Sequence, residues 1–313
     1  MVGLLDGIDK RTNLAGHNRI ELLLFRLENG QRFGINVFKV QEAIQCPVFT
    51  QVPRSHSVVC GIANLRGKTV SIIDLSMAVG GAPHPRDGSG YVIITEYNRS
   101  THGFLVASVE QIIHLEWSQI YPAPKGVGAG SYMTAVTQYN KELVEIVDVE
   151  KVLTEVIGVD EHLSDSLVVD SPAEAHHVLV VDDSSVARHQ VKQVLDALKV
   201  TCTLAKDGQE AWEQLQAWLK EGKDLPSYLS LVISDIEMPR MDGYTLTTRM
   251  RADPRTADLY ILLHSSLSGV FNQSMVEKVG ADKFLAKFVP DELATLVKDC
   301  LTEHRSHSTA SAA

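Results

Sequence analysis

Three aspartates stand directly after apolar runs in the second half of the sequence. Asp182 and Asp183 follow the run 178–181, and Asp235 comes just after 231–234. Carboxylates that meet in a partly dry cleft repel one another, so they need either raised pKa values or a cation. Oxygen ligands of this kind suit Mg2+, which keeps several waters and accepts phosphate oxygens. The pattern therefore predicts a magnesium site in this half of the chain.

Two further polar side chains stand at the ends of the next two apolar runs. Ser265 follows 260–264, and Lys287 follows 283–286. A lysine and a hydroxyl opposite a magnesium ion would complete a site for a phosphoryl group, because they can neutralise and hydrogen-bond its equatorial oxygens. A carboxylate is a competent acceptor for that group once its charge is offset. The aspartates alone could cap helices and the lysine alone could be solvated, but the whole set favours a site.

The apolar runs alternate with helical periodicity, which predicts a parallel sheet covered by helices. Residues 178–181 are continuously apolar, as is typical of a strand buried on both faces. Ser184 is placed to cap a helix whose apolar residues recur at the helical period as far as Leu198. Five strand–helix units predict a doubly wound, flavodoxin-like α/β domain with a five-stranded parallel sheet. In such a sheet, sites form outside the carboxyl ends of the strands, where these polar residues fall.

Two segments carry a family resemblance. Residues 180–184 (VVDDS) and 233–243 (ISDIEMPRMDG) closely resemble the motifs of response-regulator receiver domains, and the likeness covers residues 177–303. It implies that Asp235 is the phosphoacceptor and takes its phosphoryl group from a histidine kinase. It also implies that Asp183, Asp235 and the backbone carbonyl of Glu237 hold Mg2+, with Asp182 contributing through water.

The same resemblance implies the residues that respond to phosphorylation. Ser265 corresponds to the hydroxyl switch and Phe284 to the rotating aromatic switch residue, while Lys287 would bind the phosphoryl oxygens. Receivers usually have proline after this lysine, joined through a cis bond, whereas Phe288 stands here. A cis bond without proline costs about 2.5–4 kcal/mol. The replacement therefore favours a trans bond, and with it a different direction for the Lys287 side chain.

The sequence pattern of the first half of the chain is typical of a small all-β domain. Asn29 and Gly30 predict a hairpin turn between runs 21–27 and 32–37. Further strands are expected at 69–75, 91–95, 102–107, 131–136 and 143–147. The histidines here have no ligand spacing, and the glycine-rich stretches lack the lysine and helix of a phosphate-binding loop. This domain is therefore expected to bind protein through its surface.

Three segments of this half resemble the CheW family of chemotaxis coupling proteins, namely residues 33–42, 61–75 and 120–124. The resemblance covers residues 18–157 and implies two interlocked small β-barrels. It further implies that the domain bridges the cytoplasmic tip of a chemoreceptor and the histidine kinase CheA. Glu42 and Arg66 are the candidate receptor contacts, since the five fixed donors of an arginine suit carboxylates on a partner.

The two domains are expected to be joined by a linker at residues 158–176, which are rich in serine, proline and carboxylates. Residues 304–313 are small or polar and are expected to be disordered. A CheW-like domain followed by a receiver is similar to the arrangement of the CheV-type family. That resemblance implies an adaptor that couples chemoreceptors to CheA and is regulated by phosphorylation of Asp235. The alternative is a phosphate sink that drains CheA without altering coupling.

Composition and charge argue against several other classes of function. The net charge of −10 and the pI near 5.6 argue against attraction to nucleic acid or to anionic membranes. Four dispersed cysteines fit a reducing compartment, and the first residues lack a secretory signal, so we expect a cytoplasmic protein recruited to receptor arrays. A turnover enzyme is not expected. Phosphatases of the haloacid-dehalogenase type need a second aspartate two residues after the nucleophile, where this chain has Glu237.

Overall fold

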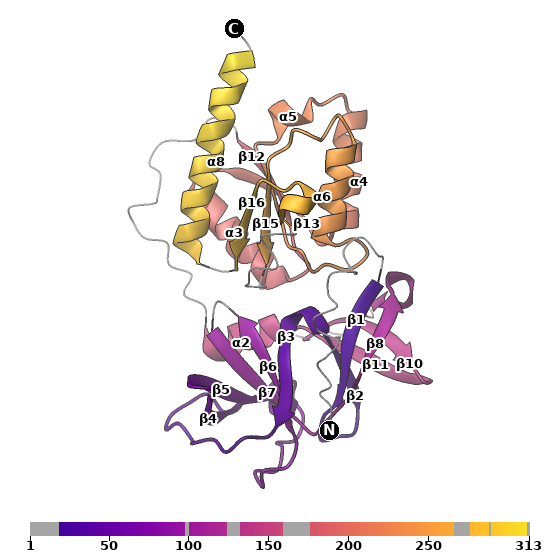
Figure 1. Cartoon of the computed structure of the whole chain (residues 1–313), viewed down its shortest axis with the longest axis vertical. Helices are drawn as coiled ribbons and strands as arrows, with labels where there is room; N and C mark the ends of the chain where they lie inside the picture. The colour runs from indigo at the N-terminus through magenta and orange to yellow at the C-terminus, as the bar shows by residue number, and fades with distance from the viewer. Residues whose placement is uncertain are drawn as a thin grey trace. The chain divides into compact units, whose positions relative to one another are not determined.

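The computed structural model describes residues 19–97, 100–123, 132–158, 176–265, 276–287 and 289–311. The chain divides into two compact units, Met1–Val159 and Asp160–Ala313, which we describe separately (Figure 1). The division falls inside the stretch 158–176. Residues 159–175 lie outside the described part of the chain, so the linker stays a prediction.

The first unit contains two β-sheets, which correspond to the two small β-barrels that the resemblance implied. One sheet has the strand order β8 (Ser108–Glu116), β1 (Arg19–Arg26), β2 (Arg32–Asn36), β11 (Glu142–Val147), β10 (Met133–Tyr139) and β9 (Tyr121–Pro122). The other has the order β3 (Val40–Gln45), β6 (Tyr91–Tyr97), β7 (Ser100–Val106), β5 (Lys68–Asp74) and β4 (Val59–Leu65). The strands expected from alternation and turn signals are all present, including the hairpin at Asn29 and Gly30.

Four strands were not expected from sequence patterns alone: β3, β4, β8 and β9. All four lie at the edges of the two sheets. Edge strands keep polar side chains in solvent, and this weakens the apolar alternation by which a strand is recognised. Their residues therefore reveal them only once their neighbours in the sheet are known.

A shared apolar core joins the two sheets of this unit. Phe25 of β1 belongs to the same buried cluster as Phe104 of β7. The helix α2 (Val149–Ile157) adds Val152, which is fully buried in that cluster, and begins at a side-chain cap formed by Asp148. Full burial of each such side chain stabilises the fold by about 1.5–3 kcal/mol. The two sheets and α2 consequently form one packed body.

The second unit is a five-stranded parallel sheet, as expected. Its order is β13 (Thr201–Ala205), β12 (His177–Val181), β14 (Leu231–Ser234), β15 (Ile261–Ser265) and β16 (Lys283–Ala286). The described helices are α3 (Ser185–Ala197), α4 (Gly208–Lys220), α5 (Leu225–Tyr228), α6 (Gly243–Ala252) and α8 (Pro290–Ser311). α3 packs against α8 and α4 against α6, and Figure 1 shows the two pairs on opposite sides of the sheet.

Local signals account for the boundaries in this unit. Ser184 caps α3 by accepting a hydrogen bond from the amide of Ala187, as its position predicted. The helix α8 continues to Ser311, beyond residue 303 where the receiver was expected to end, and the disorder expected for the tail stays a prediction. A helix that is already nucleated by packing adds further residues at little cost, even small polar ones.

Candidate functional site

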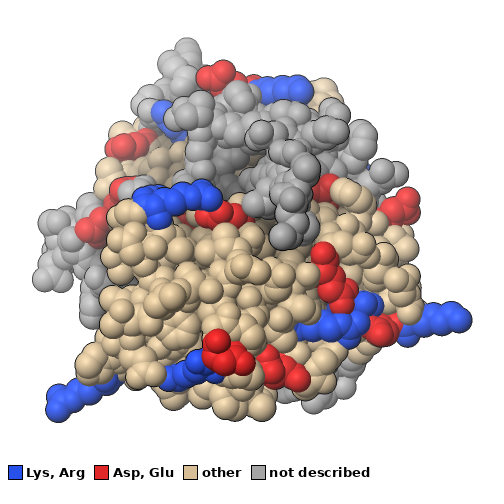
Figure 2. Space-filling view, turned by 60° about the horizontal axis from the view of Figure 1, so that its bottom comes forward, with Lys and Arg blue, Asp and Glu red and all other residues tan. Residues whose placement is uncertain are grey.

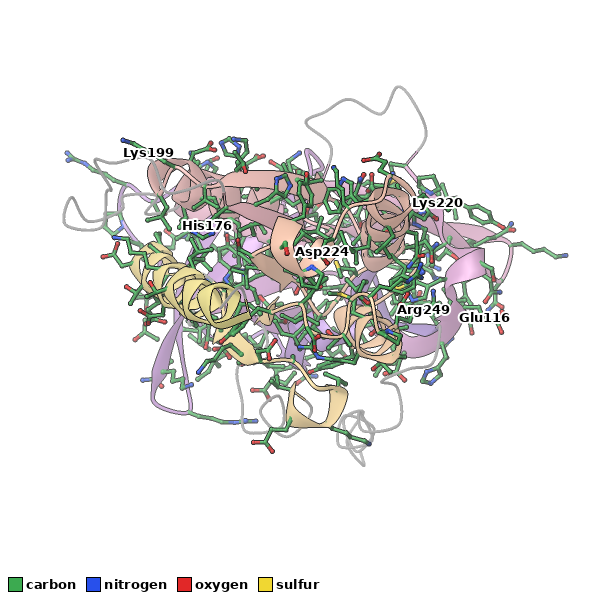
Figure 3. The ribbon with its side chains drawn as sticks, turned by 90° about the horizontal axis from the view of Figure 1, so that it is seen from above. Glu116, His176, Lys199, Lys220, Asp224 and Arg249 are labelled. Carbon is green, nitrogen blue, oxygen red and sulfur yellow. The ribbon has the colours of Figure 1, made fainter. Side chains whose placement is uncertain are left out.

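The carboxyl ends of two neighbouring strands bring the three aspartates together. Asp182 and Asp183 directly follow β12, and Asp235 follows β14, its parallel neighbour. One oxygen from each carboxylate lies within 4.8 Å of the others. The opposite end of the unit, where the strands begin, is marked by His176 and Asp224 in Figure 3. The cluster therefore lies at the edge where open parallel sheets form their sites.

The backbone holds one oxygen of two of these carboxylates. Asp182 Oδ1 accepts a hydrogen bond from the amide of Ser184 at 2.9 Å, and Asp235 Oδ1 accepts one from Ile236 at 2.7 Å. Asp182 and Asp235 are almost completely buried, whereas Asp183 is half-buried. The second oxygen of each buried carboxylate is thereby directed into the shared cluster.

Lys287 bridges these two buried carboxylates. Its Nζ lies 2.7 Å from Asp182 Oδ2 and 2.9 Å from Asp235 Oδ2, and its side chain is 3% exposed. Lys287 follows β16, and its amide donates to the carbonyl of Ser265 at 2.9 Å, which ties it to the end of β15. The different aim that Phe288 suggested is thus not found, although Phe288 itself lies outside the described residues.

The charges of this cluster suit a small divalent cation. With three carboxylates and one lysine, the four groups keep two negative charges in a largely buried space. Such a surplus is unfavourable unless a cation offsets it. The donor atoms are carboxylate oxygens, which Mg2+ prefers over nitrogen or sulfur ligands. The residues present therefore fit the magnesium ion that receiver domains bind.

The three remaining candidate residues of the receiver differ in their position and burial. Ser265 is fully buried at the end of β15. Glu237 is buried in the segment that follows Asp235. Phe284 is half-buried on β16, opposite Leu263 of β15.

Tyr244 is a tyrosine beside this cluster that sequence patterns did not reveal. Burial raises the pKa of Tyr244, and the negative charges of Glu237, Asp242 and Asp235 raise it further. Tyr244 follows Gly243, where a Cβ atom would lie only 2.1 Å from the carbonyl oxygen of Asp235. That close approach explains the glycine and brings Tyr244 close to Asp235. Its place directly after the aspartate–glycine pair is the signal that could have revealed it.

Glu42 and Arg66, the candidate receptor contacts, meet each other in the first unit. Arg66 Nη2 lies 2.7 Å from Glu42 Oε2, and the arginine side chain is 81% exposed. Arg66 occupies the turn between β4 and β5 with a φ of 52°, and Glu42 is on β3. Since β3 and β4 are the two edges of one sheet, the contact requires the sheet to curl as in a small barrel.

Charged residues of both signs occur together on one face of the molecule. On the face shown in Figure 2, basic and acidic side chains lie next to each other around a wide uncharged area. This face therefore carries no broad patch of one sign. Among the described residues, no helix is long and apolar enough to cross a membrane.

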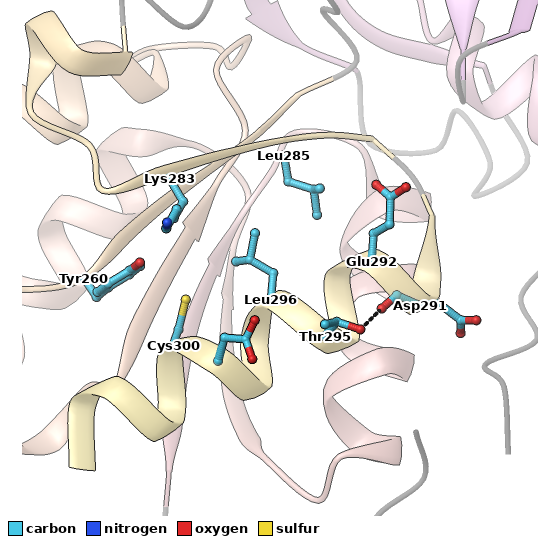
Figure 4. Close-up of a pocket in the computed structure, with 9 residues that line it drawn as sticks. Tyr260, Lys283, Leu285, Asp291, Glu292, Thr295, Leu296 and Cys300 are labelled. Carbon is cyan, nitrogen blue, oxygen red and sulfur yellow. Dashed lines mark hydrogen bonds between the residues drawn. The ribbon is translucent and has the colours of Figure 1, made fainter. Parts of the chain in front are cut away.

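A separate groove of about 510 Å3 lies between β16 and α8 (Figure 4). Tyr260, Leu285 and Leu296 supply apolar lining, and Asp291, Glu292 and Asp299 supply acidic lining. None of the three clustered aspartates contributes to it, and neither does Lys287. The groove is consequently a different feature from the carboxylate site.

Comparison with known families agrees with this division. Residues 21–156 match the CheW-like domain, and residues 178–298 match the response regulator receiver domain. The class of protein is therefore a CheW-like domain fused to a receiver, with the carboxylate cluster in the receiver.

Two relatives that align over almost the whole chain identify the family within this class of protein. The chemotaxis protein CheV3 of Helicobacter pylori is 30% identical over 95% of this chain and 99% of its own length. CheV2 of the same organism is 26% identical over 94% of this chain and 99% of its own length. The chemotaxis protein CheW of Klebsiella aerogenes is 30% identical over 47% of this chain and 89% of its own length. The chain belongs to the CheV family of chemotaxis proteins and functions in chemotaxis signal transduction.

Proposed function

We propose that this protein couples chemoreceptors to the histidine kinase CheA at receptor arrays, and that Mg2+-dependent phosphorylation of Asp235 tunes the coupling. The observation that supports the proposal best is the buried cluster of Asp182, Asp235 and Lys287 beside Asp183. The CheW-like half supplies the coupling surface, with Glu42 and Arg66 as receptor contacts.

The residues of the cluster divide the chemistry among them. Asp183, Asp235 and the backbone carbonyl of Glu237 would hold Mg2+, with Asp182 acting through water. When bound, the cation would offset charge on the phosphoryl oxygens. An oxygen of Asp235 forms the new bond to phosphorus as the phosphorus–nitrogen bond of the kinase phosphohistidine breaks, and the imidazole leaves.

Phosphorylation would change the partners of the groups around Asp235. Lys287 now shares its charge between Asp182 and Asp235, and a phosphoryl group would offer it oxygens with more negative charge. Ser265 would donate a hydrogen bond to the same group, and Phe284 would repack as Ser265 moves. The two states would then differ in the surface that the receiver presents, which is what shifts a population.

Incubation of the full chain with phosphorylated CheA and Mg2+ tests the acceptor, the metal and the partner together. An acid-labile acyl phosphate should map to the peptide that contains Asp235. The label should be lost in EDTA and in Asp235→Asn. Label at another residue, or label that persists in Asp235→Asn, would refute the proposed acceptor.

Coupling assays distinguish tuning from a phosphate sink. Receptor-stimulated CheA activity is compared for the wild type, Asp235→Ala and the wild type loaded with beryllofluoride. Tuning predicts different kinase activities for the unphosphorylated and phosphate-mimicking forms. Equal activity in all three would favour the sink, in which Asp235 drains CheA without affecting coupling.

Replacement of Glu237 by Asn is expected to shorten the half-life of phospho-Asp235. The buried carboxylate repels the additional negative charge that hydrolysis brings to the phosphoryl group, so its removal should speed hydrolysis on the order of fivefold, or about 1 kcal/mol. Decay of the acyl phosphate after removal of CheA gives the rate. Glu237→Gln keeps the side-chain length and should act in the same direction. An unchanged half-life in both variants would rule out a role for this charge.

A further inference from the structure

An ion pair outside the carboxylate cluster connects α4 to the segment after the acceptor. Asp207 caps α4, and its Oδ1 accepts a hydrogen bond from the amide of Glu210 at 2.9 Å. Its Oδ2 accepts from Arg240 Nε at 2.7 Å and lies 2.5 Å from Arg240 Nη2. The carboxylate is only 3% exposed, whereas the arginine side chain is 45% exposed, so the arginine reaches from the surface to the buried cap of α4. Burial of the carboxylate leaves the pair less screened by solvent than a pair in which both side chains are exposed.

Arg240 lies in the acceptor loop, which we define as residues 236–242 between β14 and α6. Its φ is 62°, a left-handed conformation that suits glycine and is unfavourable for a side chain such as arginine. Such a conformation persists only where the surroundings enforce it. Two kinds of contact hold it here: the amide of Met241 donates to the carbonyl of Pro239 at 2.6 Å, and the arginine side chain contacts Asp207.

Backbone contacts fix the same loop at two other points. The amide of Gly208 donates to the carbonyl of Met241 at 3.1 Å, and a Cβ at Gly208 would lie 2.5 Å from that oxygen. The amide of Gly243 donates to the carbonyl of Ile236 at 2.9 Å. The loop is thus held between the start of α4 and its own first residue, and Glu237 lies inside the closed stretch.

We propose that Arg240 is a positioning residue for the magnesium site. Held by Asp207, it fixes the acceptor loop so that the backbone carbonyl of Glu237 stays where the cation needs it. The inference rests on the proposed function for the identity of the cation and for the role of that carbonyl. In this proposal Arg240 acts through the conformation of the loop, because its guanidinium is paired with Asp207.

Titration of the full chain with Mg2+ in a calorimeter tests this assignment without any phosphodonor. Arg240→Ala and Asp207→Asn should each weaken Mg2+ binding about tenfold, as loss of a residue behind a metal ligand usually does. Arg240→Gly should lose affinity as well, although glycine adopts the left-handed conformation readily. Arg240→Lys should recover part of the loss, since one donor can still reach Asp207.

Arg255 provides the matched control. It also forms an arginine–aspartate pair, with Asp253 at 2.6 Å, but this pair is more exposed and lies outside the acceptor loop. Arg255→Ala should leave Mg2+ binding within about twofold of the wild type, as expected for an exposed pair.

Three results would overturn the assignment. One is wild-type affinity in Arg240→Ala together with a lower melting temperature, which would make the pair purely structural. Another is wild-type affinity in Arg240→Gly, which would show that backbone conformation alone matters. The third is a full loss of affinity in Arg240→Lys. A wild type that binds Mg2+ but takes no phosphoryl group from CheA would instead refute the proposed function.

Discussion

Lys287→Met should lower the free energy of unfolding of the receiver by about 3–5 kcal/mol in metal-free buffer. The substitution keeps much of the side-chain volume but removes the charge that lies between Asp182 and Asp235. Two buried carboxylates would then face each other, with Asp183 close by and no lysine to offset them. Thermal unfolding in EDTA, followed by calorimetry, measures the effect.

Mg2+ should restore most of that loss, because a divalent cation replaces the missing positive charge. The rise in melting temperature on addition of Mg2+ should therefore be larger in Lys287→Met than in the wild type. Phosphorylation should nevertheless stay severely impaired, since the lysine also neutralises the phosphoryl oxygens. Lys283→Met is the matched control, because Lys283 is an exposed lysine on β16. Equal Mg2+ shifts in Lys287→Met and in the wild type would contradict the charge balance proposed for this cluster.

Charge reversal at Arg66 should abolish binding to chemoreceptor tips while leaving the fold intact. The Arg66 side chain is 81% exposed, and an exposed pair such as the one with Glu42 contributes only about 0–1 kcal/mol to stability. Arg66→Glu should therefore leave the circular dichroism unchanged. In pull-downs with receptor fragments, the carboxylates of the partner would meet a like charge, and binding should fall by more than about tenfold.

The double variant Glu42→Arg/Arg66→Glu separates docking from local structure. It can re-form the ion pair in reverse, so a purely structural role predicts that binding returns. A docking role predicts that binding stays lost, because the charge presented to the receptor is still inverted. Lys141→Glu is the control, since Lys141 is also an exposed basic residue in a hairpin turn with positive φ. Full receptor binding by Arg66→Glu would remove Arg66 from the proposed interface.

Short-range patterns predicted much of the fold. The continuous apolar run 178–181 and the cap at Ser184 gave β12 and the start of α3, because burial on both faces and capping depend on neighbouring residues. The same reasoning missed β3, β4, β8 and β9, whose side chains at the sheet edges are partly in solvent. It also did not predict that α8 continues past residue 303 to Ser311.

The carboxylate site was accessible to sequence reasoning for a related reason. Parallel strands end at one edge of their sheet, so residues just after apolar runs must lie near one another. Asp182, Asp183 and Asp235 meet on that basis alone. The direction of the Lys287 side chain was not predicted, because Phe288 in place of the usual proline favours a different loop conformation. Its contacts with two of the aspartates follow only from the tertiary structure.

The order of residues was enough to identify the groups at the sheet edge and the succession of the two domains. Which distant side chains become partners depends on how the chain folds in three dimensions. Arg66 meets Glu42 because a sheet curls until its edges approach, and Arg240 meets Asp207 because α4 starts against the acceptor loop. Such pairs depend on the closure of the chain in three dimensions, and local periodicity carries no information about it.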